Sequence, residues 1–119
     1  MDIQLSRGKN SVENFAILNL EGRLDSFNYE SLKDKVNTLL KMGNVRLVLD
    51  LSSVNFIAVP TLIFIIKLSK QLKKKPKGQL YALNLNSDLK DHFEKVRGLE
   101  SVVCISSLTE IGKSNKVSL

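Results

Sequence analysis

The apolar residues of this sequence fall into short segments that alternate between strand-like and helix-like patterns. Residues 45–51 form a nearly continuous apolar run, as expected for a strand that is covered on both faces of a sheet. In residues 29–40, by contrast, apolar side chains recur every three or four positions, which predicts an amphipathic helix. Strands that alternate with helices along a chain indicate an α/β layer fold with a largely parallel sheet.

The order of the expected elements is strand, strand, helix, strand, helix, strand, helix, strand, helix. The first two strands are expected to pair as a hairpin around a turn at residues 8–10, and Gly22 is expected to end the second strand. The predicted class is therefore α/β, with a mixed sheet of about five strands, an N-terminal hairpin and three to four helices. The expected bounds are 3–7, 12–20, 29–41, 45–51, 60–74, 79–83, 87–98, 102–105 and a short terminal helix from 107.

Helix ends are marked by residues with known positional preferences. Asn28 is a suitable N-cap for the first helix. Pro60 suits the first position of the second helix, because its missing N–H would have no partner there. The third helix is expected to be capped by Asn86 or Ser87 and closed by Gly98.

Length and composition predict one ordinary globular domain over residues 1–119. The chain has 43% apolar and 25% charged residues, which excludes collagen-like and disordered classes. Its single cysteine, Cys104, allows neither an intrachain disulfide nor a multi-cysteine metal site, and the N-terminus lacks a signal-peptide core. A cytoplasmic protein is therefore expected. The most apolar run, residues 56–66, is shorter than the roughly 20 residues of a membrane span, so it is expected to lie in the core.

The net charge of +6 comes from one segment. A nucleic-acid-binding surface usually combines spread cations with Arg or aromatic residues, and this segment has neither. Its lysines are therefore expected to solvate the end of the second helix, and no direct contact with nucleic acid is predicted. The lysines are Lys67, Lys70, Lys73, Lys74, Lys75 and Lys77.

The sequence shows no recognisable catalytic or cofactor-binding constellation. The only histidine, His92, lies among charged residues of a predicted helix, and Cys104 is expected to be an inert apolar side chain of a strand. Neither a phosphate-binding nor a dinucleotide-binding glycine loop is present. Asp25 and Asp50 both follow strand-like runs and could share a rim, but no further polar group joins them. We therefore expect no enzyme, no catalytic residue, no metal and no cofactor.

Three segments, taken in order, resemble the STAS domain family, which contains the bacterial anti-sigma factor antagonists. They are residues 20–25 (LEGRLD), 49–57 (LDLSSVNFI) and 96–102 (VRGLESV). The resemblance covers nearly the whole chain and implies a STAS-like fold. It also implies a bacterial, cytoplasmic protein-binding module of signal transduction and transcription regulation. The implied partner is an anti-sigma factor or a serine/threonine regulatory kinase.

The functional centre of that family is an Asp-Ser-Ser-Gly loop at the start of the second helix. Its second serine is phosphorylated by a partner kinase, which switches partner binding. The corresponding stretch here is Ala58, Val59, Pro60 and Thr61, so a proline without a hydroxyl stands at the phosphorylated position. The resemblance thus implies a docking module that is not switched at this position. Thr61, one residue further along, is the remaining candidate phosphosite.

The exposed side of the second helix is expected to take part in partner binding. At 100° per residue, Thr61, Ile65, Leu68 and Leu72 share one face, which we assign to the core. Ile63 falls on the opposite face, at a position where the family usually has Gly, and Ile66 lies on its flank. The predicted partner-binding residues are Asp25, Ala58, Val59, Pro60, Thr61, Ile63 and Ile66.

The sequence alone leaves two other functions open. A non-switchable scaffold of the same family could form a homo-oligomer through a sheet edge or an apolar helix surface. A small-ligand carrier, for a lipid or a nucleotide, could use the rim near Asp25. This second alternative is weaker, because the sequence supplies neither a nucleophile nor a phosphate-cradling glycine loop. A single aliphatic residue facing water is also common and needs no function.

Overall fold

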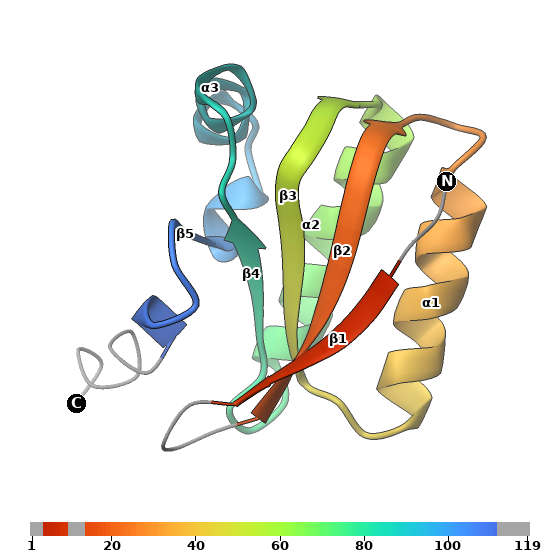
Figure 1. The fold of residues 1–119 in the computed structure, drawn as a ribbon, viewed down its shortest axis with the longest axis vertical. Helices are drawn as coiled ribbons and strands as arrows, with labels where there is room; N and C mark the ends of the chain where they lie inside the picture. The colour runs from red at the N-terminus through yellow and green to blue at the C-terminus, as the bar shows by residue number, and fades with distance from the viewer. Residues whose placement is uncertain (1–3, 10–13, 112–119) are drawn as a thin grey trace.

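The chain folds into one sheet with helices packed against it (Figure 1). The computed structural model describes residues 4–9 and 14–111. The predicted α/β order is confirmed. The predicted terminal helix from 107 begins later than expected, since residues 107–109 form a turn and only Glu110 and Ile111 are helical before the described residues end. The backbone N–H of Ser107 donates to the Glu110 carboxylate at 2.9 Å, as expected from the capping-box spacing. The elements are β1 (Gln4–Lys9), β2 (Asn14–Leu24), α1 (Tyr29–Lys41), β3 (Arg46–Ile57), α2 (Val59–Lys73), β4 (Gln79–Leu83), α3 (Ser87–Lys95), the 3₁₀ helix η1 (Leu99–Ser101) and β5 (Val103–Ile105).

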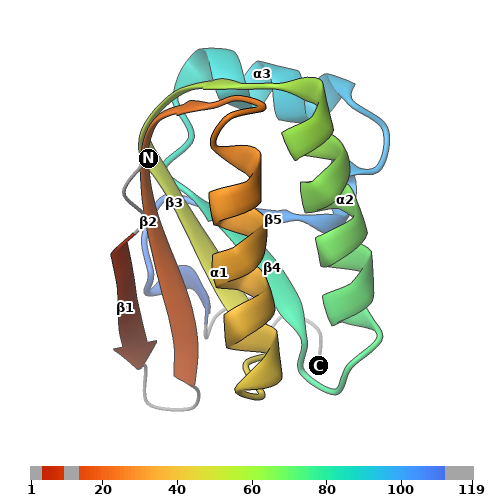
Figure 2. The same ribbon diagram turned by 90° about the vertical axis from the view of Figure 1, so that its right-hand side faces the viewer.

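The sheet has five strands in the order β1-β2-β3-β4-β5. β1 is antiparallel to β2, and the other neighbouring pairs are parallel. The predicted mixed sheet with an N-terminal hairpin is therefore confirmed. The predicted turn at residues 8–10 is displaced, because Gly8 and Lys9 still pair within β1, while Asn10 lies outside the described residues. Figure 2 shows α1 and α2 side by side on one face of the sheet.

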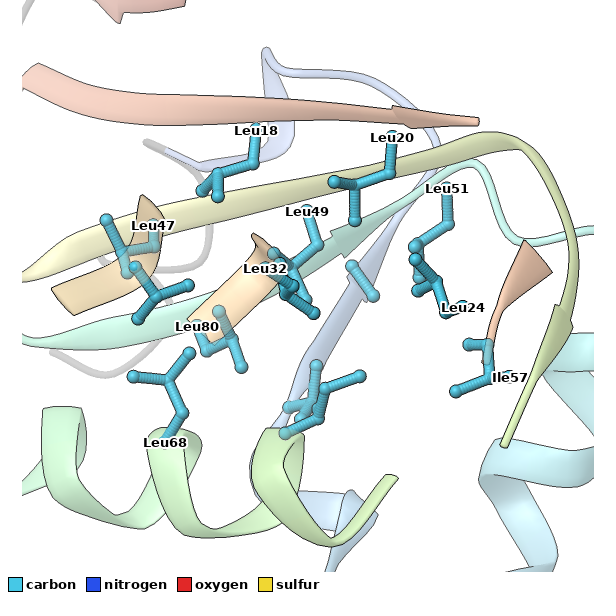
Figure 3. Packing of buried hydrophobic residues seen from close by; sticks show 14 of the residues in the cluster. Leu18, Leu20, Leu24, Leu32, Leu47, Leu49, Leu51, Ile57, Leu68 and Leu80 are labelled. Carbon is cyan, nitrogen blue, oxygen red and sulfur yellow. The ribbon is translucent and has the colours of Figure 1, made fainter. Parts of the chain in front are cut away.

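Most of the core lies between this face of the sheet and the two helices. Leu18 and Leu20 of β2 and Leu47, Leu49 and Leu51 of β3 point toward the helices and are nearly inaccessible to solvent (Figure 3). Other residues of the same strands, Phe15 and Ile17 of β2 and Val48 of β3, belong to a second buried cluster on the other face of the sheet. The prediction that residues 45–51 form a strand covered on both faces is thus confirmed.

Two strands are longer than their sequence patterns predicted. β2 continues past Gly22 to Leu24, and the pairing register shifts on both sides of Glu21–Gly22. Gly22 has a φ of +84°, so it allows an irregular pairing within the strand instead of ending it, and that prediction was wrong. β3 continues to Ile57, but beyond Leu51 it buries every third residue, so its alternation is lost.

The beginnings of α1 and α2 lie within one residue of their predicted positions. Asn28 is the N-cap residue of α1, but its side chain makes no capping bond and its Nδ2 donates to the carbonyl oxygen of Arg23 at 2.6 Å. α2 begins at Val59 with Ala58 as its N-cap residue, which places Pro60 at the second helical position. Pro60 still lies within the first turn, where its missing N–H leaves no helical hydrogen bond unmade.

The third helix is shorter than predicted. Its N-cap is Asn86, as expected, and the Asn86 Oδ1 accepts a hydrogen bond from the backbone N–H of Leu89 at 2.9 Å. α3 ends at Lys95, because Val96 has an extended backbone. Gly98 therefore does not close α3. With a φ of +102° it forms the N-cap of η1, a short helix that the sequence pattern did not reveal.

Candidate functional site

The end of β2 and the start of α2 meet at the carboxyl edge of the sheet. Because β2 and β3 are parallel, their carboxyl ends lie side by side, and Leu24 pairs with Ile57 at this edge. The backbone N–H of Ala58 donates to the carbonyl oxygen of Leu24 at 2.9 Å. The turn at residues 25–28 is therefore brought next to the beginning of α2, at the upper edge of Figure 2.

Asp25 shapes the turn that follows β2. Its Oδ1 accepts hydrogen bonds from the backbone N–H groups of Phe27 at 3.0 Å and Asn28 at 3.1 Å. Its carbonyl oxygen accepts from the N–H groups of Asn28 and Tyr29. Asp25 was predicted to be a partner-binding residue. It follows β2 directly and so lies near the start of α2, but its carboxylate is used within its own turn. Its contribution to the surface is to hold Phe27 in place.

Asp25 and Asp50 do not share one rim, a possibility that the sequence left open. Asp50 lies in the middle of β3, where it is flanked by Asn19 and Leu83, because the strand extends well beyond it. Its Oδ1 accepts hydrogen bonds from the backbone N–H and the hydroxyl of Ser52 at 3.1 and 2.7 Å. Both carboxylates therefore act in local structure, and they form no acid–base pair.

Thr61 joins α2 to β2 in the interior. Its side chain is fully buried, and its Oγ1 donates a hydrogen bond to the carbonyl oxygen of Leu24 at 3.1 Å. The other residues assigned to the core face of α2 are also buried, so the predicted helix phase is confirmed. A kinase could reach the Thr61 hydroxyl only if the start of α2 opened, which makes Thr61 a poor candidate phosphosite.

Large apolar side chains gather on the surface of this edge. Among the described residues, the exposed ones are Phe27 (91%), Val59 (65%), Met42 (62%), Ile63 (47%) and Phe56 (37%). Only Met42 lies elsewhere, after the end of α1. The predicted exposure of Ile63 is thus confirmed, whereas the prediction that residues 56–66 lie wholly in the core is wrong. We call Phe27, Phe56, Val59, Pro60 and Ile63 the carboxyl-edge patch.

Aromatic contacts support this patch from two sides. The guanidinium carbon of Arg23 lies 4.1 Å from the centre of the Phe56 ring, and the two residues are register partners in β2 and β3. The rings of Tyr29 and Phe64 meet edge to face with their centres 5.7 Å apart, which fixes the start of α1 against α2. Phe27 was missed by the sequence reasoning. The available signal was an aromatic residue inside a turn of otherwise polar residues.

The remaining predicted surface residues are less accessible. Ile66 is half-buried and packs over Gly98, since a Cβ atom built at Gly98 would lie 3.0 Å from the Ile66 Cγ2. Ala58 is also half-buried. Neither residue is therefore included in the carboxyl-edge patch.

A second surface feature lies between α3 and the end of β5. It is an open cavity of about 230 Å³, with Lys90, Cys104 and Glu110 in its lining. Cys104 lies in a strand, β5, as predicted, but its side chain is exposed and not packed in the core. Partial desolvation raises the pKa of its thiol, which keeps it in the weakly nucleophilic protonated form.

Within residues 4–9 and 14–111, no three His, Cys, Asp or Glu side chains are grouped so that they could hold a metal ion. Over the same part of the chain, none of the helices has the length and apolar character needed to cross a membrane.

Comparison with known proteins identifies relatives of this fold. The STAS domain family model matches residues 8–111. An anti-sigma factor antagonist from Mycobacterium paratuberculosis aligns with a TM-score of 0.75 and 12% identity, covering 97% of this chain and 95% of that one. Unphosphorylated SpoIIAA, an anti-sigma factor antagonist, aligns with a TM-score of 0.69 and 14% identity, and the alignment covers 99% of this chain and 100% of SpoIIAA. The phosphorylated form of the Bacillus protein SpoIIAA aligns with a TM-score of 0.66 and 15% identity, and the alignment covers 95% of this chain and 99% of that one. A search of curated protein sequences gave no match.

Proposed function

The chain belongs to the STAS domain family, and from this premise we propose that it is a protein-binding regulatory module. It docks on an anti-sigma factor or a regulatory serine/threonine kinase, in the manner of an anti-sigma factor antagonist. The structural neighbours described as anti-sigma factor antagonists support this proposal. It acts in the cytoplasm of a bacterial cell and catalyses no reaction.

The observation that carries this proposal is the clustering of exposed apolar side chains at the carboxyl edge. Single exposed apolar residues are common, but four of the five large apolar side chains that are exposed among the described residues lie at this one edge. Phe27 is almost fully exposed, so docking would remove most of an aromatic ring from water. Buried aromatic side chains are frequent centres of binding energy in protein interfaces.

Docking at this surface is not switched by a phosphate at Pro60. A phosphate at the start of a helix is normally stabilised by the free N–H groups and by the helix dipole. Pro60 offers no hydroxyl, and the hydroxyl of Thr61 is buried against Leu24. The module therefore binds its partner irrespective of kinase activity toward this loop.

Affinity capture from the native cell tests this function, with two variants beside the wild type. Ile63→Asp places a charge in the carboxyl-edge patch, and we expect it to lose the captured regulator. Met42→Asp is the matched control, because Met42 is exposed to a similar degree but lies at the other end of α1. Mass spectrometry should identify a kinase or an anti-sigma factor with the wild type and with Met42→Asp.

In terms of helix electrostatics, the control Met42→Asp is the less favourable of the two variants. An aspartate at residue 63 lies four residues before Lys67, which is a favourable helical pair. An aspartate at residue 42 lies at the C-terminus of α1, where the helix dipole opposes a negative charge. Loss of capture in Ile63→Asp alone is assigned to the surface when urea titration gives the two variants similar midpoints. Equal capture by both variants would contradict the proposed surface.

The same patch favours one alternative function, a scaffold in which two copies of the chain pair through Phe27 and Ile63. Sedimentation velocity of the purified protein separates the two functions. A concentration-dependent dimer that Ile63→Asp converts to a monomer would support the scaffold. A monomer at high concentration would exclude it.

A further inference from the structure

The exposed face of α2 changes character along its length. At 100° per residue, Val59, Ile63, Lys67, Lys70 and Lys74 fall within an arc of about 80°. All five side chains are exposed. The first two belong to the carboxyl-edge patch, and the other three follow them toward the helix end. We call Lys67, Lys70 and Lys74 the lysine stripe.

The charge around the lysine stripe is predominantly positive. α2 contains no Asp or Glu, and three further lysines lie beside the end of the stripe or beyond it. One acid, Glu100, lies close by: the pKa of its carboxyl is lowered chiefly by hydrogen bonds from the backbone N–H groups of Glu100 and Gly98, and Lys70 adds to the shift. The additional lysines are Lys73, Lys75 and Lys77.

We propose that the partner docking on the carboxyl-edge patch carries an acidic strip, which the lysine stripe of α2 binds. This inference rests on the proposed function. It adds the chemistry of the partner surface and the direction in which the partner lies along the helix. Ile63 and Lys74 are separated by about 16 Å along the axis at 1.5 Å per residue. The acidic strip therefore begins within that distance of the partner's apolar contact site.

The arrangement of the stripe fits a protein better than a membrane or a nucleic acid. A helix that lies on a membrane buries one apolar face in lipid and keeps its cations beside that face. The main apolar face of α2 is instead buried inside the protein, with Ile65, Leu68 and Leu72 fully or nearly fully covered. Nucleic-acid contacts normally add Arg or aromatic side chains among the lysines, and this stripe has none.

The stripe is expected to affect the rate of association more than the lifetime of the complex. Exposed lysines keep most of their hydration, so each contact in the complex contributes little. Their combined field acts before contact, however, and charge complementarity of this kind raises association rates by about 10- to 1,000-fold at low salt.

Binding kinetics with the captured regulator, purified, test this inference. The triple variant Lys67→Gln/Lys70→Gln/Lys74→Gln should associate at least about 10-fold more slowly at low salt, with most of the salt dependence lost. The control is Lys35→Gln/Lys41→Gln/Lys95→Gln, which removes the same charge from exposed positions outside α2. Equal slowing in both triple variants would overturn the inference, because net charge alone would then explain it.

Site-specific photo-cross-linking locates the acidic strip. With the photoreactive residue p-benzoylphenylalanine at position 74, the cross-linked partner peptide should be rich in Asp and Glu. At position 63 it should be mainly apolar. A neutral or basic peptide from position 74 would refute the inference and leave the proposed function intact, provided that position 63 still cross-links. Failure of both positions to cross-link would refute the proposed function itself. Co-sedimentation with vesicles of 30% phosphatidylserine in phosphatidylcholine, lost in the lysine-stripe variant, would overturn the inference in favour of a membrane.

Discussion

The buried hydroxyl of Thr61 provides the sharpest test of how α2 is held. Thr61→Val removes the hydrogen bond to the carbonyl oxygen of Leu24 but keeps the side-chain shape. A neutral hydrogen bond contributes about 0.5–1.5 kcal/mol net. The Leu24 oxygen still accepts from Ala58, so no buried acceptor is left unpaired. The new methyl group, at about 0.8 kcal/mol per buried carbon, offsets part of the loss. We expect a net destabilisation of no more than about 1 kcal/mol.

Thr61→Glu, which imitates phosphorylation, should behave very differently. It places a charge at a fully buried position, and the effective cost of burying an ion is several kcal/mol. That cost is comparable with the whole stability of a small domain, about 5–15 kcal/mol. Ile63→Glu is the matched control, because residue 63 is exposed and should tolerate the same side chain.

Urea denaturation followed by far-ultraviolet circular dichroism measures these differences. With a slope of about 1–3 kcal/mol per molar urea, Thr61→Val should lower the midpoint by at most about 1 M. Thr61→Glu should be largely unfolded without urea, whereas Ile63→Glu should unfold near the wild-type midpoint. A Thr61→Glu variant as stable as Ile63→Glu would refute the burial of Thr61 and restore it as an accessible phosphosite.

Three further predictions concern the loops around this surface. Pro60→Ser restores the hydroxyl of the family loop and should change the free energy of unfolding by no more than about 1 kcal/mol, because proline at a helix start acts mainly on the unfolded chain. A loss of several kcal/mol in a urea titration would show that Pro60 has a larger role than occupying the first turn of α2. Gly98→Ala should lower the free energy of unfolding by about 2–3 kcal/mol, because the added Cβ meets Ile66 and the φ of +102° is unfavourable for alanine. Gly43→Ala is the control: its φ is +90° but the space around it is open, so it should cost only about 1 kcal/mol. Equal costs would mean that Ile66 moves aside freely. The pKa of Glu100 lies below its usual value of 4.5, chiefly because backbone N–H groups, including that of Gly98, donate to its carboxylate. The stability that the ionised carboxylate contributes is therefore present above pH 4.5 and is lost as the pH falls through the folded-state pKa. Glu100→Gln should thus be less stable than the wild type at pH 7, and the difference should shrink toward pH 3. A stability difference that stays constant with pH would contradict this.

Much of the fold could be predicted because apolar periodicity reports burial directly. The continuous run at 45–51 marked a strand buried on both faces, and the spacing of Thr61 to Leu72 gave the correct phase of α2. The extensions of β2 and β3 could not be predicted, because irregular pairing at Gly22 and burial of every third residue beyond Leu51 break the two-residue period.

The candidate site was predicted less completely. Exposure of Ile63 followed from the helix phase, since 100° steps place it opposite the core face. Exposure of Phe27 did not follow, because an aromatic residue in a turn has no periodic neighbours that would show which way it points. The local roles of Asp25 and Asp50 were also missed, because short-range hydrogen bonds to neighbouring backbone groups leave no distinct sequence spacing.

Amide hydrogen exchange of the chain with and without its purified partner tests the docking surface most directly. We predict that partner binding slows exchange in the turn at residues 25–30 and at residues 56–66. The segment 39–44 at the other end of α1, which contains the exposed Met42, should exchange at the same rate in both states. Protection confined to residues 39–44 or to β1, with the carboxyl edge unchanged, would contradict the proposed docking surface.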